Sequence, residues 1–374
     1  MTCFSLVKMW CVLAVSMLTA CSSSKALAPL HVFSLVNQAH VGDSNQIKGV
    51  IAAFQEHPEQ PVIQRDQLDD LKGCDKPLVL VAGAAGFKQL LAISLPPQAM
   101  RCFLTHQAPG DLQELVGRID LLALPTHAIS NDIETWATKH NIVLVPTVGV
   151  AHNTSAKTVT DAYWAGLDLI KVSKPYLAVM LGGDAPQADG TIRYYTTEEA
   201  QAFAVTIAAL AKQQGASVLV LNGPRTGKFD PVSCIENTGV HRDGKQDLVT
   251  KVFMHELAQQ KLMAQLFDFQ FGQPSQFHAV LGAIKATNGV MVVNGESTSM
   301  VAECTTVLDP KQILLATNGA MNETHHKHVQ QEYLAGRAGL LKLDGSVVRM
   351  SKQAGRYASA ADHIALSILA IVNA

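Results

Sequence analysis

The sequence predicts an α/β protein built from two doubly wound domains that face a cleft. Short, continuously apolar runs alternate with amphipathic stretches from residue 30 onward, which is typical of parallel strands covered on both faces by helices. At 374 residues the chain is too long for one ordinary core. Pro175 separates two series of such runs of similar length, so it marks the expected crossover between the domains.

Composition agrees with two packed cores and excludes one class of partner. Hydrophobic residues make up 48% of the chain and charged residues 16%, which supplies enough apolar side chains for both domains. Lys and Arg number 29 against 31 Asp and Glu, a net charge of -2. Because nucleic-acid binding needs a basic surface, this balance argues against DNA and RNA as partners.

Residues 1–27 are predicted to be a leader rather than part of a domain. Their apolar stretch, residues 9–20, has the form of a secretory signal and is too short to span a bilayer. The ending Leu-Thr-Ala-Cys resembles a bacterial lipobox, which would make Cys21 the lipidated first residue of a membrane-associated mature chain. The alternative is an uncleaved leader on a cytoplasmic protein.

The first domain is predicted to span residues 28–174. Helical patterns occupy 44–55 and 130–140. Apolar strand patterns occupy 30–36, 76–83, 100–105, 119–124 and 141–146.

The second domain is predicted to span residues 175–350, followed by a closing C-terminal helix within 351–374. Thr196 and Glu199 have the spacing of a capping box at the start of its longest helix. Strand patterns occupy 176–183, 216–223, 267–272, 288–295, 311–318 and 338–345.

Three loops at strand ends of the second domain carry the candidate binding site: "LGGDAP", "LNGPRTGK" and "VNGESTSM". Ligands of open α/β sheets bind beyond the carboxyl ends of the strands, and glycine and hydroxyl residues there expose N–H groups to a phosphate. The candidate phosphate-binding residues are Gly182, Gly183, Arg225, Thr226, Ser297, Thr298 and Ser299.

The hydroxyl run in the third loop is expected to cap the next helix and to direct its free N–H groups at a diphosphate. Glu303, further along that helix, is expected to accept hydrogen bonds from ribose hydroxyls. An ordinary structural cap without a ligand is the alternative interpretation of the hydroxyl run.

Two other motif interpretations fail. "GPRTGK" is not a P-loop, because Asn222 stands where the first Gly is required and Phe229 follows the Lys. His325, His326 and His328 have no carboxylate or cysteine at ligand spacing, so an exposed helix start is the better interpretation. The sequence therefore predicts no metal and no bound cofactor.

Several segments resemble, in the same order, the signature segments of the Elm-type mitochondrial fission proteins and their bacterial relatives, which are also labelled predicted nucleoside-diphosphate-sugar epimerases. These segments are "LVNQAHVGDSNQIKGVIAAF", "ALPTHAISND", "PTVGVAHNTSAK", "VMLGGDAP", "LVLNGPRT" and "VVNGESTSMVAEC". The resemblance covers residues 30 to 343. It implies a GT-B architecture of two Rossmann-like domains, in which the second holds a nucleotide-diphosphate sugar as donor without a metal.

The chain departs from the family pattern at the positions expected to carry chemistry. Relatives have Gly-His where this chain has Gly42-Asp43, so Asp43 or the nearby His40 is the candidate general base. Relatives have Ser-Arg-Arg-Thr where this chain has one arginine, Arg225. These departures affect the inferred activity more than the inferred fold.

Three functions are compatible with the sequence. The first is a metal-independent glycosyltransferase that uses a nucleotide-diphosphate sugar. The second is a non-catalytic binding or scaffold protein with the same fold, which the loss of family residues in the first domain favours. The third is a lipid-anchored solute-binding protein, which Cys21 favours because exported proteins have no supply of cytoplasmic nucleotide sugars.

Overall fold

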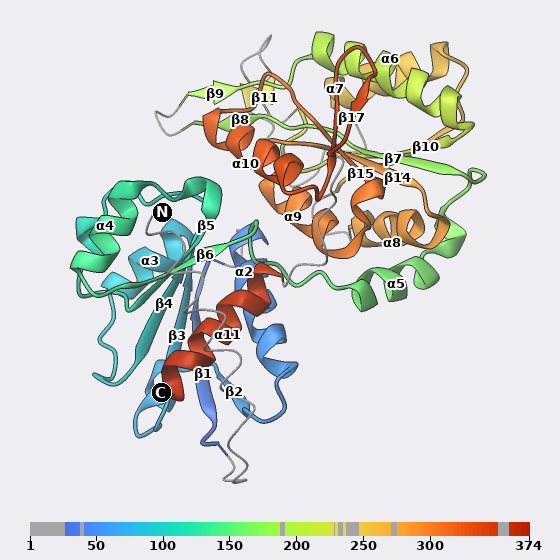
Figure 1. Ribbon diagram of the computed structural model, residues 1–374. Coiled ribbons are helices and arrows are strands. Elements are labelled where there is room, and N and C mark those ends of the chain that lie inside the picture. The colour runs from blue at the N-terminus through green and yellow to red at the C-terminus, as the bar shows by residue number, and fades with distance from the viewer. Residues whose placement is uncertain are drawn as a thin grey trace.

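The protein is a mixed α/β structure with two large parallel sheets, which confirms the predicted class. The computed structural model describes residues 27–37, 41–187, 191–227, 229–230, 235–236, 247–270, 275–350 and 359–374. Within these ranges there are ten α-helices, and the two sheets lie apart from each other (Figure 1). The domain boundaries and the GT-B arrangement around a cleft stay predictions.

The first sheet has six parallel strands in the order β2-β1-β3-β4-β5-β6. Since β1 pairs with β2 on one side and β3 on the other, the strand order reverses at β1, where α/β sheets commonly bind ligands. The strands are β1 (Leu30–Leu35), β2 (Val62–Arg65), β3 (Pro77–Ala82), β4 (Met100–Leu104), β5 (Leu121–Pro125) and β6 (Val143–Thr147).

The second sheet has seven strands in the order β13-β10-β7-β14-β15-β16-β17. All neighbours are parallel except β16 and β17. The strands are β7 (Tyr176–Met180), β10 (Ser217–Leu221), β13 (Ala264–Phe267), β14 (Val290–Asn294), β15 (Ile313–Ala316), β16 (Gly339–Leu341) and β17 (Val347–Val348).

The remaining elements are helices and two small antiparallel ladders. The ladders pair β8 (Ala185–Pro186) with β9 (Ile192–Arg193) and β11 (Phe229–Asp230) with β12 (Ile235–Glu236). The α-helices are α2 (Val41–Gln55), α3 (Gly83–Leu91), α4 (Asn131–Lys139), α5 (Ala156–Ala165), α6 (Thr197–Gln214), α7 (Leu248–Gln259), α8 (Phe277–Thr287), α9 (Thr298–Val307), α10 (Glu323–Leu334) and α11 (Ala360–Val372). Short 3-10 helices are η1 (Leu68–Leu71), η2 (Gln113–Leu115), η3 (Thr126–Ala128), η4 (Leu167–Leu169) and η5 (Pro310–Gln312).

The central strands are apolar along their whole length because both of their faces are covered. Every residue of β3, β5, β7 and β10 is buried, and side chains of alternate residues enter separate cores on the two faces of each sheet. This is the burial expected of strands in a doubly wound sheet.

The C-terminal helix α11 belongs to the core of the first sheet although it follows the second sheet in sequence. It packs against α2 and β6, and it lies beside them in Figure 1. Ile364, Ala365 and Ile368 are buried with residues of β1, α2 and β3. The chain therefore passes from the first sheet to the second and returns.

The predicted strand at 267–272 is wrong, because β13 ends at Phe267. The Asn222 side chain donates from Nδ2 to Asp268 Oδ1 (2.6 Å) and accepts from the Phe269 N–H (2.6 Å). These bonds take the backbone that follows Phe267 out of the ladder. Strand β2 was not predicted, because its residues are half-buried or exposed and include Gln64 and Arg65.

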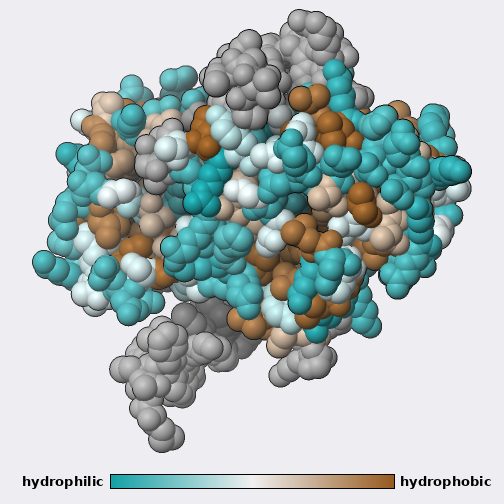
Figure 2. All heavy atoms as spheres, turned by 90° about the horizontal axis from the view of Figure 1, so that it is seen from above, coloured by the Kyte–Doolittle hydropathy of each residue, from teal (hydrophilic) through white to brown (hydrophobic). Residues whose placement is uncertain are grey.

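No helix in the described part of the chain is long and hydrophobic enough to cross a membrane. On the face shown in Figure 2, hydrophobic side chains form separate groups among hydrophilic ones. Cys21 lies outside the described residues, so its lipidation stays a prediction.

Candidate functional site

The three candidate loops at the ends of β7, β10 and β14 lie in direct contact. The Gly183 N–H donates to Glu296 Oε1 (2.9 Å), and the Asp184 N–H donates to the Arg225 carbonyl oxygen (2.9 Å). Arg225 Nη2 in turn donates to the Glu296 carbonyl oxygen at 3.4 Å. The structure thus brings the first-loop glycines and Arg225 to the start of the third loop, as expected from the parallel strands.

The two glycines are required by close packing. A Cβ atom on Gly182 would lie 2.5 Å from Asn318 Nδ2, and one on Gly183 would lie 2.8 Å from the backbone carbon of Arg225. The Gly183 N–H donates to Glu296, so this group is already used within the protein. Gly183 therefore shapes the loop, because it packs closely against Arg225 and holds Glu296.

Glu296 is a central residue that the sequence interpretation did not single out, although it lies inside the quoted loop. Its side chain is buried and also accepts from Asn318 Nδ2 (2.8 Å). Burial raises the pKa of this carboxyl group, while the positive charge of Arg225 and the hydrogen bonds act in the opposite direction. Glu296 therefore links the loops that follow β7 and β15, and its carboxyl group lies within the electrostatic influence of Arg225.

Thr226 has a structural position within the second loop. Its hydroxyl oxygen accepts from the Gly223 N–H (3.0 Å), and the residue is buried. Thr226 therefore closes the turn that carries Arg225.

The third loop leaves the start of α9 without a side-chain cap. Ser297 occupies the N-cap position, but its side chain accepts no cap hydrogen bond, so the predicted hydroxyl cap is wrong at this residue. By contrast, Thr196 and Asn322 complete capping boxes at α6 and α10. Ser297, Thr298 and Ser299 are partly exposed. The first N–H groups of α9 therefore lack this common intramolecular acceptor and form a positive dipole end.

Glu303 joins α9 to the segment that follows β6. Its Oε2 accepts a hydrogen bond from the hydroxyl of Thr154, and His278 Nε2 lies 3.3 Å from the same oxygen. Since the single Thr154 hydroxyl hydrogen goes to Glu303, the 3.0 Å contact between Thr154 Oγ1 and His278 Nε2 requires the imidazole to donate. Every hydrogen bond of the Glu303 side chain to a described residue goes to Oε2, and Oε1 accepts none of them.

A second histidine strengthens the same connection. His152 Nδ1 accepts from the Thr154 N–H (3.2 Å), so neutral His152 carries its proton on Nε2, which faces Thr306 Oγ1 at 3.1 Å. Burial lowers the pKa of His152, which favours this neutral form. The segment after the first sheet is thus attached to α9 of the second sheet.

On the first sheet, Asp43 lies against the start of α3. A Cβ atom on Gly83, which has φ +66°, would come 2.1 Å from Asp43 Oδ2. Gln46 Nε2 donates weakly to the other carboxylate oxygen at 3.4 Å. His40, the other candidate base, lies outside the described residues.

His106, in the loop after β4, is a further residue at this junction that sequence reasoning missed. Burial lowers the pKa of its imidazole, Asp43 raises it, and Arg225 lowers it. His106 is nevertheless exposed to solvent, so its side chain lies in a concave part of the surface. The charges of Asp43 from the first sheet and Arg225 from the second therefore act on one imidazole.

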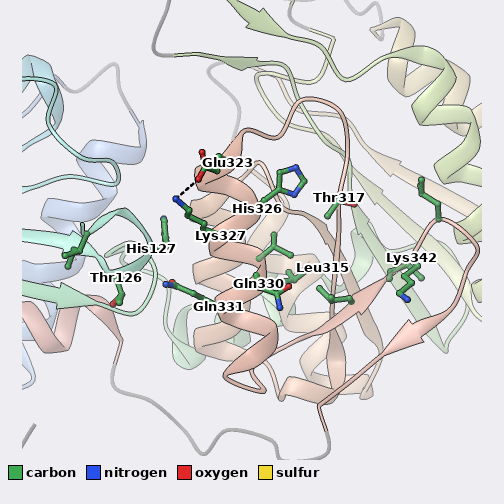
Figure 3. A pocket seen from close by; sticks show the side chains of 15 residues that line it. Thr126, His127, Leu315, Thr317, Glu323, His326, Lys327, Gln330, Gln331 and Lys342 are labelled. Carbon is green, nitrogen blue, oxygen red and sulfur yellow. Dashed lines mark ion pairs between the residues drawn. The ribbon is translucent and has the colours of Figure 1, made fainter. Parts of the chain in front are cut away.

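A pocket of about 910 Å³ lies on another side of α10, between η3 and β16 (Figure 3). Glu323 and Lys327 form an ion pair at its edge (2.7 Å). None of the candidate residues lines this pocket. We place the candidate site at the strand ends, where the polar groups converge, rather than in this open hollow.

Within the described ranges, no group of three or more His, Cys, Asp or Glu residues is arranged to hold a metal ion. His325 is in the first turn of α10, where the sequence placed a helix start, whereas His328 is fully buried and not exposed as expected.

No protein-family model matches the chain, and no curated protein matches it either. It is similar to a solved α,α-trehalose-phosphate synthase (UDP-forming) from Burkholderia vietnamiensis, with 11% identity over 87% of this chain and 72% of that chain and a TM-score of 0.34. It is also similar to shikimate 5-dehydrogenase from Listeria monocytogenes (9% identity, 87% and 89% covered, TM-score 0.22). A third similar structure is NAD-dependent formate dehydrogenase from Staphylococcus aureus (10% identity, 92% and 93% covered, TM-score 0.19). With TM-scores this low, the functional argument rests on the residues of this chain.

Proposed function

We propose that the chain binds a nucleotide-diphosphate sugar between two GT-B-type domains, residues 28–174 and 175–350, and that it is a metal-independent glycosyltransferase related to the Elm-type proteins. The observation that carries this proposal is the uncapped start of α9 beside Arg225, where the loops after β7, β10 and β14 meet. A helix start with free N–H groups and an adjacent guanidinium is suited to a diphosphate.

The proposed donor contacts follow from these positions. The α9 N–H groups, the hydroxyls of Ser297, Thr298 and Ser299, and Arg225 would bind the diphosphate. Glu303 Oε1, which accepts no hydrogen bond from a described residue, would accept one from a ribose hydroxyl. Gly182, Gly183 and Thr226 would act by shaping the two loops that hold Arg225.

The proposed chemistry is transfer of the sugar to an acceptor hydroxyl. Asp43 or His40 would take the acceptor proton as the acceptor oxygen forms a bond to the anomeric carbon. The bond from that carbon to the diphosphate oxygen would break, and the diphosphate would leave with the electron pair. Arg225 and the α9 N–H groups would stabilise its negative charge.

A thermal-shift screen of the full chain against nucleotides and nucleotide-diphosphate sugars tests the binding proposal, because a ligand specific for the folded state raises Tm. We expect a shift with a diphosphate sugar that Glu303→Ala removes. Glu323→Ala, which changes an exposed carboxylate of α10, is the matched control and should keep the shift. No shift with any of these ligands would overturn the proposal.

Turnover separates the catalytic proposal from the scaffold alternative. Release of the nucleoside diphosphate in the presence of acceptor alcohols would support a transferase. Binding that persists without any release would instead identify a non-catalytic protein that retains the donor site.

A further inference from the structure

Four charged or titratable side chains converge at the junction of the two sheets, and two of them are histidines without an assigned role. Asp43 follows β1, His106 follows β4, Arg225 follows β10, and His325 follows β15. All four therefore lie beyond the carboxyl ends of parallel strands, where α/β sheets bind ligands.

Strand register and a ring stack place these groups at one junction. Leu104 of β4 pairs with Ala123 of β5, so the loop that carries His106 lies beside η3. His127 of η3 stacks on His328, one turn after His325 on α10. Burial, together with the nearby Arg225, His328, His106 and His326, lowers the pKa of His325 to about 4. Asp43 raises the pKa of His106, and Arg225 lowers it. His106 and His325 thus lie at this junction on different sheets, and the charge of Arg225 acts on both imidazoles.

The donor atoms of this cluster are held in place and are available. Arg225 uses Nη1 and Nη2 for long contacts, both 3.4 Å, to the carbonyl oxygens of Asp184 and Glu296, and a guanidinium has five N–H groups. His325 Nδ1 accepts from the Asn322 N–H (3.2 Å), so its proton lies on Nε2.

His106 is presented by a tight turn. Thr105 Oγ1 on one side of it donates to the Gln107 carbonyl oxygen on the other side (2.9 Å). The His106 imidazole forms no hydrogen bond to another residue in the described part of the chain, so it too has a donor to offer.

We propose that His325 and His106 bind the diphosphate together with Arg225, so that the anion is held from both sheets and its binding adds a proton to His106. This inference rests on the proposed function and adds the first sheet to the diphosphate site. Asp43, on the first-sheet side, would repel the anion and thereby place it on the Arg225 side of the His106 imidazole.

The sign of the pH dependence follows from the groups that face the site. In the free protein both imidazoles are neutral near pH 7, because burial and neighbouring cations lower their pKa values. A bound anion raises the pKa of His106, so affinity should increase as the pH falls from 8 towards 5. His325 Nδ1 accepts from the Asn322 N–H, so this ring binds in its neutral form through the Nε2 hydrogen. The other groups that face the cluster are His127, His326, His328, Glu296 and Glu332.

Isothermal titration calorimetry of the full chain tests this with two probes, inorganic pyrophosphate and UDP-glucose, at pH 6 and pH 8. Wild type is compared with His325→Gln and His106→Gln at each pH, so that the ionisation of pyrophosphate itself cancels. We expect His106→Gln to weaken binding about tenfold at pH 6 and much less at pH 8, since only the protonated imidazole forms a charge-assisted hydrogen bond. His325→Gln removes a neutral Nε2 donor, so it should weaken binding about threefold at both pH values. His255→Gln, at an exposed site on α7, is the control and should bind as wild type does.

The outcomes separate this inference from the proposed function. Pyrophosphate binding with the expected losses, but no nucleotide binding, would keep the anion site and overturn the nucleotide-sugar proposal. Nucleotide-sugar binding that neither histidine substitution changes at pH 6 would overturn the two-sided site and leave the proposed function standing. Absence of binding by both probes would overturn both, and circular dichroism of each variant confirms that it is folded.

Discussion

The imidazole rings of His127 and His328 stack with their centroids 4.4 Å apart and their planes tilted by 30°. His127 belongs to η3, after the first sheet, and His328 belongs to α10 of the second, so the stack joins the two halves of the chain. Both residues are buried, and His127 Nε2 and both ring nitrogens of His328 have no hydrogen-bond partner among the described residues. His328 Nε2 also lies 3.4 Å from Glu332 Oε1, so the stack is next to a buried carboxyl group of α10.

Acid should destabilise the protein through His127. Burial, with a smaller effect from His328, lowers the pKa of His127 to about 3, whereas the unfolded residue titrates near 6.5. Its contribution is present above pH 6.5 and is lost as the pH falls towards 3, by up to about 1.4 kcal/mol per pH unit. Between pH 6 and pH 5, His127→Phe should reduce the loss of unfolding free energy by about 1 kcal/mol, measured by urea denaturation. His255→Gln, at an exposed site on α7, is the control, and equal slopes in wild type and His127→Phe would contradict the assignment.

The ion pair between Glu332 and Arg337 should contribute strongly to the stability of the protein. Arg337 donates from Nε to Glu332 Oε2 (2.5 Å) and from Nη2 to Oε1 (2.8 Å), and Glu332 is buried. Glu332→Gln removes the buried carboxylate that accepts two hydrogen bonds from Arg337, so we expect the free energy of unfolding to fall by about 3 kcal/mol. Glu323→Gln breaks the exposed pair with Lys327 on the same helix and should change it little. Similar denaturation midpoints for the two variants would count against this prediction.

Replacement of Gly183 should disturb the Arg225 loop. In Gly183→Ala the new Cβ would lie 2.8 Å from backbone and side-chain carbons of Arg225, so one of the two loops must shift. We expect a loss of about 1–3 kcal/mol in unfolding free energy and weaker pyrophosphate binding. Gly110→Ala, where no atom lies within 4 Å of the new Cβ, is the control. If folded Gly183→Ala protein binds pyrophosphate with wild-type affinity, the position of the Arg225 loop does not affect anion binding and the prediction is wrong.

The Thr154 hydroxyl should stabilise the connection between β6 and α9. Thr154→Val keeps the shape of the side chain but removes the hydrogen donated to Glu303 and the oxygen that faces His278. Because one partner is a buried carboxylate, the expected cost is about 2 kcal/mol of unfolding free energy. Thr160→Val, at an exposed site on α5, removes a hydroxyl that bonds only to its own helix and should cost less. Equal effects of the two substitutions would refute the role of the cross-sheet bond.

The alternation of strands and helices, the capping box of α6 and the meeting of the three candidate loops were accessible from sequence, because each depends on local pattern or on parallel strand ends. Thr196 and Glu199 are three residues apart, and the structure confirms both hydrogen bonds of their capping box. Continuous apolar runs likewise predicted the strands buried on both faces.

The contacts between the sheets were not accessible, because they join residues far apart in the chain. His127 meets His328, Thr154 meets Glu303, and His106 lies near Arg225, and none of these pairs has a characteristic spacing. Glu296 was overlooked for a different reason. A carboxylate within a phosphate-type loop has no obvious role until its partner, the Gly183 N–H, is seen.

The return of α11 to the first sheet determines when that sheet can be completed during synthesis. A ribosome releases residues 28–174 long before residues 360–372, so the faces of α2 and β6 that α11 covers stay open to water or to chaperones until residues 360–372 emerge. A nascent chain stalled before residue 360 would carry a finished second sheet and an unfinished first one, and a premature stop codon near the C-terminus would damage the half of the protein encoded at its beginning.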